Sequence, residues 1–406
     1  MKYVVIVPDG MADYPVLELG GRTPLEAANT PAFDRLAEAG EVGMVKTIPE
    51  GMAPGSDTAN LAVMGYDPRV YYFGRSPFEA ISMGLNLADT DAVFRCNVVT
   101  LSEDEPYGEK TMLDHSSDEI STEEARELLE TVNQHLRTEE MTFYPGVSYR
   151  HILVWNNAPF DFRFTPPHDI IGRKIKEYLP AGPYGSLFLG MMEKSSKFLK
   201  DHPVNIRRKE RGLKPANSIW IWGEGKKPRL PNFFEKYGLN GSVISAVDLI
   251  KGIGICAGLE PIEVEGATGN FHTNYEGKAR AALDALQNGR DLVYIHIEAP
   301  DECGHRYEIE NKVKSIEAID ARIVKPITAE LEAGGEEYAV LLLPDHPTPL
   351  RLRTHTAEPV PFLIYRSGDK KDGRGQIYNE ASAAAAGRYI EEGHKLMDYF
   401  VGKLPW

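Results

Sequence analysis

The sequence predicts an α/β protein with a mostly parallel sheet flanked by helices, together with a second, smaller domain. Three short apolar runs, residues 2–7, 292–297 and 338–343, are typical of buried strands, and each leads into a loop with an acidic residue. Helical patterns alternate with the later runs, at residues 274–286 and 313–331, which indicates a parallel sheet. A chain of 406 residues exceeds the usual size of one hydrophobic core, so we expect two domains.

The first apolar run ends at Pro8, so Asp9 lies in the loop at the carboxyl end of the predicted strand. A helix is then predicted from Pro31, with Thr30 as its N-cap and Gly40 after its last turn. In open α/β sheets, ligands bind beyond the carboxyl ends of the strands. Asp9 is therefore placed where a ligand would bind.

Ser56 follows a Pro54-Gly55 turn and stands at the start of an apolar helical pattern. The backbone N–H groups and the dipole of a helix N-terminus stabilise an anion, and direct binding to a divalent cation would lower the pKa of the hydroxyl further. Ser56 is thus a candidate nucleophile. From the local sequence alone, an ordinary helix cap is the better interpretation.

The middle of the chain differs from both ends in its composition, which indicates an inserted domain. It contains an acidic helical stretch at residues 121–136, a strand-like stretch at 148–155 and a basic segment at 194–214. In the basic segment eight Lys and Arg residues face two acidic ones, against the balance of the whole chain. The segment is either a solvated helix face or a basic cap over an anionic substrate.

The loops after the second and third apolar runs hold acidic residues and histidines. Asp301 and His305 are four residues apart, Asp345 and His346 are adjacent, and His355 follows a little later. Each residue alone has an ordinary explanation as a polar loop residue. Carboxylates and neutral imidazoles are, however, the ligands of divalent metals, and a site for two metals needs about six or seven of them. Together they predict a metal site.

Charge and composition exclude several classes of protein. A formal net charge of -15 argues against a general nucleic-acid binder, so an anionic substrate would be met by bound cations or clustered arginines. The chain has no run of 18 apolar residues and no signal-peptide pattern. Its three cysteines, Cys96, Cys256 and Cys303, form no CxxC motif. We therefore expect a cytoplasmic protein without a membrane partner; the sequence does not indicate an oligomeric state.

The motifs together resemble those of the alkaline phosphatase superfamily. They occur in the order VPDG, PGSDTAN, EAPDECGH, PDH and THT. More closely, the chain resembles the archaeal-type cofactor-independent phosphoglycerate mutases over nearly its whole length. The resemblance implies an alkaline-phosphatase-like core of residues 1–86 and 215–406, and an inserted α+β substrate-binding or cap domain of residues 87–214.

The resemblance also implies a ligand set and a reaction. One metal would be bound by Asp301, His305 and His355, and the other by Asp9, Ser56, Asp345 and His346. The metals of this family are usually Mn²⁺, with Mg²⁺, Zn²⁺ or Co²⁺ as variants, and 2,3-bisphosphoglycerate is not required. Ser56 would take the phosphoryl group from 3-phosphoglycerate and return it to the other hydroxyl of the glycerate, giving 2-phosphoglycerate through a phosphoserine, a step of glycolysis and gluconeogenesis.

A small phosphorylated anion requires groups that hold a carboxylate and a phosphate, and arginine does so with two parallel hydrogen bonds. The candidates are Arg95, Asn97, Arg150, His151, Arg207 and Lys251, with Arg208 and Arg75 as further possibilities. Asp114 or His115 is a candidate acid or base of the insert.

Three other functions stay open at this point. A homoserine kinase-like phosphotransferase would use the same metal ligands but pass the phosphoryl group to an amino-acid hydroxyl. A metal-dependent phosphatase or phosphodiesterase would let water attack the phosphoserine, and a long insert that excludes water argues against it. A non-catalytic binding protein would retain the fold without needing Ser56.

Overall fold

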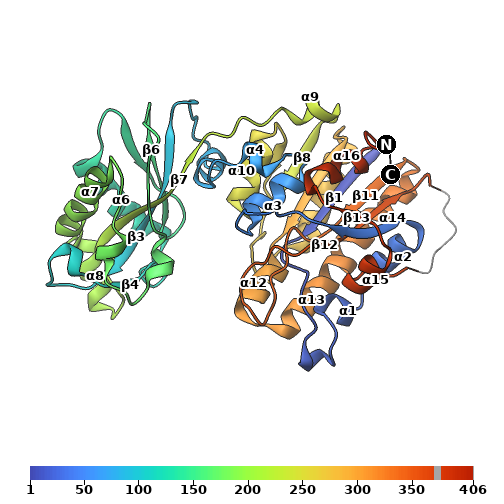
Figure 1. The fold of residues 1–406 in the computed structure, drawn as a ribbon, viewed down its shortest axis with the longest axis horizontal. Helices are drawn as coiled ribbons and strands as arrows, with labels where there is room; N and C mark the ends of the chain where they lie inside the picture. The colour runs from blue at the N-terminus through green and yellow to red at the C-terminus, as the bar shows by residue number, and fades with distance from the viewer. Residues whose placement is uncertain (370–375, 406) are drawn as a thin grey trace. The chain divides into compact units, whose positions relative to one another are not determined.

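The computed structural model describes residues 1–369 and 376–405, which form two compact units (Figure 1). The core unit consists of Met1–Tyr72 and Arg229–Trp406, and the insert unit of Phe73–Pro228. The insert unit extends beyond residues 87–214 at both ends. It includes helix α5 (Ser76–Ser82) and strand β7 (Ser218–Lys226), because β7 pairs with β3 (Ala92–Leu101) and the Ser76 hydroxyl donates to the Gly223 carbonyl.

The core unit is built on an eight-stranded sheet with the order β13-β2-β12-β11-β1-β10-β8-β9. The strands from β11 to β9 run parallel, whereas β12 is antiparallel to both of its neighbours. The prediction of a mostly parallel sheet is confirmed. The strands are β1 (Lys2–Pro8), β2 (Glu41–Val45), β8 (Gly241–Ile244), β9 (Glu260–Ile262), β10 (Leu292–Ile297), β11 (Tyr338–Leu342), β12 (Val360–Arg366) and β13 (Tyr389–Ile390).

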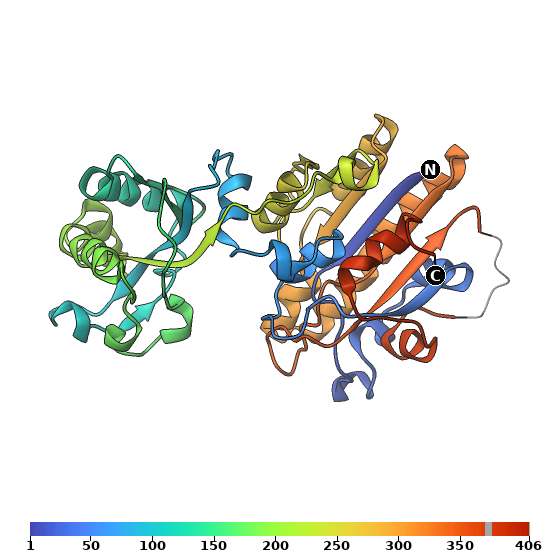
Figure 2. The ribbon, with the colours of Figure 1, turned by 45° about the horizontal axis from the view of Figure 1, so that its top comes forward.

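The three apolar runs of the sequence form the adjacent strands β11, β1 and β10 at the centre of this sheet. They are buried because helices cover both faces of the sheet (Figure 2), which explains why they read as continuous apolar runs. Pro8 is in register with Ile297, and Ile6 with Leu342. The loops after the three strands therefore begin at the same edge of the sheet.

The helices predicted from Pro31, from Ser56 and at residues 274–286 are present in the core unit, together with others that were not predicted. They are α1 (Pro24–Ala27), α2 (Pro31–Ala39), α3 (Ser56–Val63), α4 (Pro68–Tyr71), α9 (Phe233–Tyr237), α10 (Asp248–Cys256), α11 (Tyr275–Gln287), α12 (Ala299–Arg306), α13 (Ile309–Ile319), α14 (Lys325–Gly334), α15 (Glu380–Ala385) and α16 (Leu396–Phe400). Short 3₁₀ turns lie at Leu17–Leu19 and Gly393–Lys395. The helix predicted at 313–331 is α13 and α14 joined by a π-helical turn at Asp320–Val324.

The N-terminus of α2 corrects the predicted helix cap. Thr30 occupies the N-cap position, but its side chain makes no capping hydrogen bond. Instead the carboxylate of Asp320, in the π-helical turn, accepts the Phe33 N–H at 2.8 Å. A carboxylate at a helix N-terminus also stabilises the helix through its interaction with the helix dipole. The side chain that caps this helix is therefore Asp320, which lies far from Thr30 in the sequence.

The insert unit is an α+β fold around an antiparallel sheet in which β3 pairs with both β6 and β7. Its other strands are β4 (Met112–Asp114), β5 (Met141–Tyr144) and β6 (Arg150–Trp155), and its other helices are α6 (Thr122–Leu136), α7 (Gly185–Leu199) and α8 (Pro203–Glu210), with 3₁₀ turns at Tyr107–Glu109, Pro167–Ile170 and Ile175–Tyr178. The predicted helix at 121–136 and strand at 148–155 are confirmed as α6 and β6. The basic segment spans the end of α7 and all of α8. Among the described residues, no helix of either unit has both the length and the apolar character that crossing a bilayer requires.

Candidate metal centre and nucleophile

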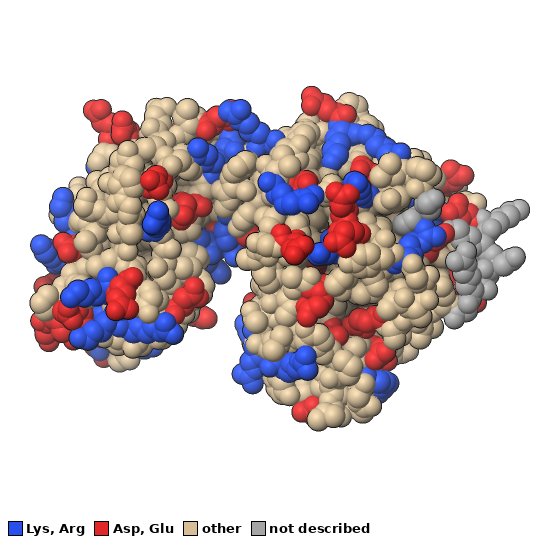
Figure 3. All heavy atoms as spheres, in the orientation of Figure 1, with Lys and Arg blue, Asp and Glu red and all other residues tan. Residues whose placement is uncertain are grey.

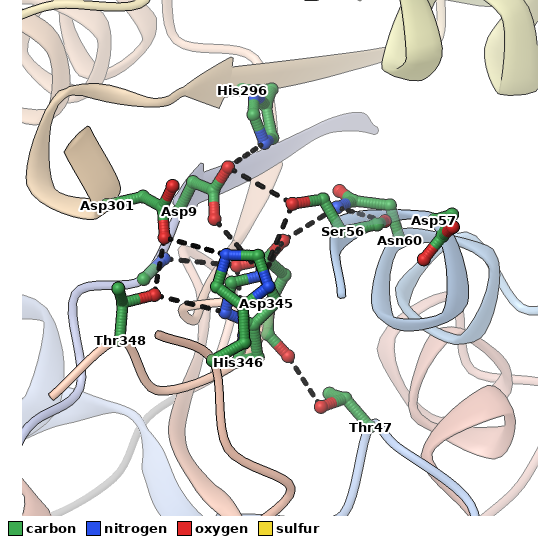
Figure 4. A network of polar contacts seen from close by, with 12 residues as sticks. Asp9, Thr47, Ser56, Asp57, Asn60, His296, Asp301, Asp345, His346 and Thr348 are labelled. Atoms are coloured by element: carbon green, nitrogen blue, oxygen red, sulfur yellow. Dashed lines mark hydrogen bonds and ion pairs between the residues drawn. The ribbon is translucent and has the colours of Figure 1, made fainter. Parts of the chain in front are cut away.

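Five candidate residues of the core unit converge at the carboxyl ends of the central strands (Figure 4). Asp9 follows β1, Asp301 lies in the first turn of α12 after β10, and Asp345 and His346 follow β11. Ser56 reaches the same place from the first residue of α3. The register of the three strands brings the aspartates and His346 together, and the N-terminus of α3 adds Ser56.

Asp9, Asp345 and His346 form one group whose ligand atoms all lie within 4.8 Å of one another. His346 Nε2 is 3.5 Å from Asp9 Oδ1 and 3.5 Å from Asp345 Oδ2. The Ser56 hydroxyl faces this group, because its Oγ lies 3.4 Å from Asp9 Oδ2 and 3.2 Å from His346 Nε2. The N-cap of α3 is Gly55, and Ser56 is the next residue, so Ser56 is not an ordinary helix cap.

A second group contains Asp301, His346 and His355, again with ligand atoms within 4.8 Å of one another. His355 Nε2 is 3.4 Å from Asp301 Oδ1. His305 joins this group, since its Nε2 lies 3.2 Å from Asp301 Oδ2 and 2.9 Å from His355 Nε2. His346 is near both groups, whereas the resemblance assigns it to the metal of Asp9. All seven residues of the predicted ligand set therefore lie in one cluster.

Neighbouring groups fix the orientation of the candidate ligands. His305 Nδ1 lies 2.9 Å from the carbonyl of Arg353, and since a carbonyl only accepts, Nδ1 carries a proton and Nε2 is the nitrogen that faces Asp301 and His355. Arg353 has a left-handed backbone with φ 56°. The Thr348 hydroxyl donates to Asp301 Oδ1. Such supporting contacts are typical of built metal sites.

Gly10 allows the loop after β1 to approach the second group closely. Its φ of +61° is a backbone conformation that other residues rarely adopt, and a Cβ at this position would lie 2.7 Å from Asp301 Oδ1 and 2.5 Å from Thr348 Oγ1. Its N–H donates to Asp345 Oδ1 at 3.2 Å. The motif VPDG contains this glycine, but the sequence does not reveal that Asp301 lies against it.

The three carboxylates of the cluster differ in their proton affinity. Burial and the nearby carboxylates of Asp345 and Asp301 raise the pKa of Asp9 well above its usual range. Burial also acts to raise the pKa of Asp301, but hydrogen bonds from His305 and His355 bring it well below its usual range. The pKa of Asp345 is lowered as well, because the imidazoles of His346 and His296 outweigh its burial.

The cluster fits bound divalent cations. Asp9 Oδ1 is buried and has no hydrogen-bond partner, and the same holds for His296 Nε2, which lies 3.1 Å from Asp9 Oδ2 without hydrogen-bond geometry. Burial lowers the pKa of His296 to about 4. Buried carboxylates without enough partners are costly unless a cation compensates them. The mixture of carboxylate oxygens and imidazole nitrogens suits several divalent metals.

In the insert unit, Arg95 and Asn97 lie on β3 and are already held by neighbours. Arg95 Nε donates to Glu79 Oε2 at 2.8 Å, and its guanidinium lies 4.8 Å from the centre of the Trp222 ring. Asn97 accepts a hydrogen bond from Trp222 Nε1 at 3.0 Å and donates one to the His115 carbonyl at 3.0 Å. Glu79 and Trp222 were not found by sequence reasoning; both carry ordinary signals of a helix face and a buried strand.

Arg150 and His151 lie on β6, directly opposite Asn97 and Cys96 on β3. Arg150 is exposed, with its guanidinium 5.2 Å from the centre of the Tyr149 ring. His151 Nδ1 accepts the Gly146 N–H at 3.1 Å, its Nε2 is buried without a partner, and burial lowers its pKa to about 3. Arg150 lies opposite Asn97 and therefore shares a face of the sheet with Asn97 and Arg95, whereas His151 lies opposite Cys96 and points to the other face, so the structure does not bring His151 to this group.

Arg207 and Lys251 lie neither in the metal-ligand cluster nor on the paired strands β3 and β6. Arg207 forms an exposed ion pair with Glu127 at 3.0 Å. Lys251 belongs to the core unit, on α10, where its Nζ pairs with Asp248 and Glu263 at 3.1 and 2.9 Å.

The remaining candidates are also committed to neighbours. Arg208 is buried and contacts Glu124, the Ser117 carbonyl and the Lys214 carbonyl. Arg75 Nε lies 3.3 Å from Glu79 Oε1, and Asp114 accepts from Lys214 at 2.8 Å, which keeps the Asp114 pKa low against its partial burial. The ring of His115 makes an edge-to-face contact with the ring of Tyr149.

The basic segment is neutralised by acidic neighbours rather than left as a bare positive surface. Lys209 pairs with Glu103, Arg211 with Glu124 and Lys214 with Asp114. Blue and red side chains intermingle on the face of the molecule that Figure 3 shows. This pairing favours the interpretation of a solvated helix face.

The fold and the site together define a class. A parallel α/β core with a serine hydroxyl among buried aspartates and histidines at the strand ends is the arrangement of a metal-dependent phosphoryl-transfer enzyme. The family model described as 2,3-bisphosphoglycerate-independent phosphoglycerate mutase matches residues 37–205. The chain belongs to this family.

Relatives similar to this chain extend over its whole length. A protein of Geobacter sulfurreducens named as a probable 2,3-bisphosphoglycerate-independent phosphoglycerate mutase is 52% identical over 404 residues, 99% of this chain and 100% of the relative. The mutase of Methanosarcina acetivorans is 51% identical over 388 residues, 95% and 96% of the two chains. Among solved structures, a Pyrococcus horikoshii protein has a TM-score of 0.81 at 29% identity, covering 100% of this chain and 98% of that one. The cofactor-independent phosphoglycerate mutase of Thermoplasma acidophilum has a TM-score of 0.67 at 26% identity, covering 99% and 100%.

Proposed function

We propose that this protein interconverts 3-phosphoglycerate and 2-phosphoglycerate, without 2,3-bisphosphoglycerate, and that Ser56 is its nucleophile. The observation that carries the proposal is the Ser56 hydroxyl, which lies within 3.4 Å of Asp9 and 3.2 Å of His346 in a chain whose full-length relatives are named as such mutases. A hydroxyl among acidic and imidazole ligands is suited to form a phosphoserine.

Two features of the core unit prepare the Ser56 oxygen for reaction. Asp9 accepts the hydrogen bond of the Ser56 hydroxyl, which orients the oxygen. Helix α3 begins at Ser56, and the dipole of a helix N-terminus would stabilise both an ionised serine oxygen and a bound phosphate.

We propose that the clustered ligands hold two divalent cations, with Mn²⁺ expected and Mg²⁺, Zn²⁺ or Co²⁺ as alternatives. Asp9, Ser56, Asp345 and His346 would hold one, and Asp301, His305 and His355 the other. Bound there, such cations lower the pKa of the serine hydroxyl and offset the charge of the phosphoryl group. His346 is near both groups, so it lies between the two proposed positions.

In the first step the Ser56 hydroxyl loses its proton and its oxygen forms a bond to phosphorus, while the bond from phosphorus to the glycerate oxygen breaks and that oxygen takes up a proton. In the second step the other glycerate hydroxyl loses its proton and attacks the phosphorus of the phosphoserine, the bond from phosphorus to the Ser56 oxygen breaks, and the Ser56 oxygen takes up a proton. No phosphoryl group is gained or lost overall. The two steps require that the glycerate is held while it turns.

We propose that Arg95, Asn97 and Arg150 of the insert unit hold the glycerate. Support comes from charge: the pKa of Glu79 is lowered, against its burial, by three guanidinium groups, those of Arg95, Arg75 and Arg150. Positive charge therefore exceeds negative charge there, although the whole chain is acidic. A carboxylate or phosphate would find complementary groups at this place.

The proposal includes a cytoplasmic location and a small phosphorylated anion as the binding partner. The cysteines Cys96, Cys256 and Cys303 form no disulfide with one another, which suits a reducing compartment. The net charge of -15 disfavours nucleic acid as a partner.

The test is an incubation of purified protein and Mn²⁺ with 3-phosphoglycerate, followed by ³¹P NMR. We expect 2-phosphoglycerate from the wild type and none above background from Ser56→Ala, whose fold is checked by its melting temperature. Parallel samples contain homoserine with a phosphate donor, or an aryl phosphate. Phosphohomoserine without 2-phosphoglycerate would indicate a homoserine kinase-like phosphotransferase, and free phosphate without 2-phosphoglycerate would indicate a phosphatase. Equal activity of Ser56→Ala and the wild type would show that Ser56 is not the nucleophile.

A further inference from the structure

Asn60 connects the helix that carries Ser56 to the carboxylate of Asp345. It lies one turn after Ser56 on α3 and is 0% exposed. Its Nδ2 donates to the Ser56 carbonyl at 2.8 Å and to Asp345 Oδ2 at 2.8 Å (Figure 4). One side chain therefore contacts both the backbone of the candidate nucleophile and a candidate metal ligand.

Tyr294 completes this contact from β10. Its hydroxyl donates to Asn60 Oδ1 at 2.5 Å, and it is buried. Burial, with the charges of Asp345 and Asp9, raises its pKa far above the usual range, so the phenol stays protonated and remains a donor.

The orientation of the Asn60 amide is determined by these partners. A carbonyl and a carboxylate accept hydrogen bonds and donate none, so the NH₂ group must face the Ser56 carbonyl and Asp345. The carbonyl of the amide then faces the phenol, which supplies the matching donor. Both N–H bonds and the oxygen of the amide are used. No other side chain of similar size offers two donors and one acceptor in this arrangement.

Asp345 is the point where three parts of the chain meet. Its Oδ1 accepts the N–H groups of Gly10 and His346 at 3.2 and 2.9 Å, while its Oδ2 accepts Asn60. Gly10 belongs to the loop after β1, His346 to the loop after β11, and Asn60 to α3. Of these three residues, only Asn60 donates to Asp345 from its side chain, and the same side chain donates to the Ser56 carbonyl, whereas His346 contacts the Ser56 Oγ with its Nε2.

We propose that Asn60, oriented by Tyr294, is the positioning residue that fixes the distance between the Ser56 oxygen and the metal site. Asn60 does not touch the reacting atoms; it acts through Ser56 and Asp345. The inference rests on the proposed function, because it assigns Asn60 to the same nucleophile and metal ligands. Loss of such supporting contacts typically lowers metal affinity or activity about 10- to 100-fold.

The test uses two variants, each with a matched control. Asn60→Ala is paired with Asn205→Ala, because Asn205 is equally buried at 0% exposure and also makes two Nδ2 donations, to the Leu199 and Ala216 carbonyls, but in the insert unit. Tyr294→Phe is paired with Tyr66→Phe, whose buried hydroxyl donates to the Pro231 carbonyl in the core unit.

Three quantities are measured on the full chain. Calorimetric titration of metal-free protein gives the Mn²⁺ affinity, melting in chelator and in Mn²⁺ gives the rise in melting temperature that metal causes, and initial rates give kcat and KM. We expect Asn60→Ala and Tyr294→Phe to weaken Mn²⁺ binding and lower kcat about tenfold or more, with KM little changed. The two controls should lose stability in chelator but keep the full metal-induced rise.

If Asn60→Ala and Tyr294→Phe lose only stability, as the controls do, and bind Mn²⁺ like the wild type, the proposal is wrong. Tyr294→Phe removes one oxygen and keeps the ring, so it decides the matter if Asn60→Ala fails to fold. The proposed function fails separately: a wild type that binds Mn²⁺ but makes no 2-phosphoglycerate overturns the mutase, while the Mn²⁺ titrations still test the role of Asn60.

Discussion

Two sets of candidate residues can be compared: the metal-ligand cluster of the core unit, called the core group, and the substrate-binding candidates on β3 and β6 of the insert unit, called the insert group. They differ in how completely their charges are compensated by the protein itself. In the core unit, Asp9, Asp301 and Asp345 are buried together, and Asp9 Oδ1 has no hydrogen-bond partner. In the insert unit, the guanidinium of Arg95 pairs with the carboxylate of Glu79. The core group needs added cations to be stable, whereas the insert group needs none and keeps an excess of positive charge that an anionic substrate can compensate.

The two groups also differ in how the chain assembles them. Ser56 is 47 residues from Asp9 and 290 from His346, so the core group depends on the whole sheet being formed. Arg95 and Arg150 lie on adjacent strands of one small sheet. We therefore expect the core group to be sensitive to metal and to small backbone changes, and the insert group to respond residue by residue.

The largest effect is expected from metal removal. Chelation followed by dialysis should abolish mutase activity, and added Mn²⁺ should restore it. Metal at 100 times its dissociation constant would stabilise the folded chain by about 2.7 kcal/mol, so the melting temperature should fall on chelation. Activity that survives complete chelation, verified by elemental analysis, would contradict the metal site.

The same experiment distinguishes the two units. Of the four tryptophans, Trp155, Trp220 and Trp222 belong to the insert unit. Because that unit needs no cation to compensate its charges, we expect the tryptophan fluorescence at 25 °C to be nearly unchanged by chelation. A large spectral change would show that the insert depends on the metal site after all.

Gly10→Ala is expected to be the most damaging small substitution in the core. The added Cβ would strain a backbone with φ +61° and would force Asp301 and Thr348 aside. A displacement of about 1 Å in a catalytic site can cost about 100-fold in rate, which is the loss expected in kcat.

Gly335→Ala is the control, since Gly335 has φ +69° and open space around it. It should lose about 1–2 kcal/mol of stability from the left-handed backbone and keep its activity. Equal loss of activity in both variants would mean that backbone strain, and not the contact with Asp301, explains the effect.

Much of the core site could be predicted from the sequence. Strands β1, β10 and β11 are buried on both faces, so they appear as continuous apolar runs whose ends are marked by Pro8, Asp301 and Pro344. Parallel strands end at the same edge, which brought the ligands together. The groups that orient the ligands were not predicted. Asn60 shares a helix face with Ser56, a signal that was available but does not distinguish a buried support from an ordinary core residue.

The insert was harder to predict because its features depend on distant pairings. Strand β7 completes the sheet by pairing with β3 across more than a hundred residues, which the local composition does not show. The arginine-rich segment is equally ambiguous, since its acidic partners, such as Glu103 and Glu124, lie far from it in the sequence. The cap of α2 by Asp320 is the same kind of case in the core.

Arg150→Ala tests the insert group at its exposed member. Loss of a hydrogen bond to a charged group costs about 1.5–3 kcal/mol, so we expect KM for 3-phosphoglycerate to rise about tenfold or more. The melting temperature should change little because Arg150 is exposed. Arg173→Ala is the control, an exposed arginine of the same unit that contacts Tyr178. Similar KM values for the two variants would remove Arg150 from the substrate site.

The smallest effect is expected from Arg207→Ala. Arg207 and Glu127 are about half exposed, with side-chain exposures of 50% and 53%, and an ion pair of that kind contributes about 0–1 kcal/mol. Its neighbour Arg208 provides the contrast, because it is buried and contacts Glu124. Arg208→Ala should lower the melting temperature clearly, which shows that the assay detects a structural arginine on α8. A rise in KM for Arg207→Ala at an unchanged melting temperature would instead return Arg207 to the substrate site, and the basic segment would then be a cap over the substrate and not a solvated helix face.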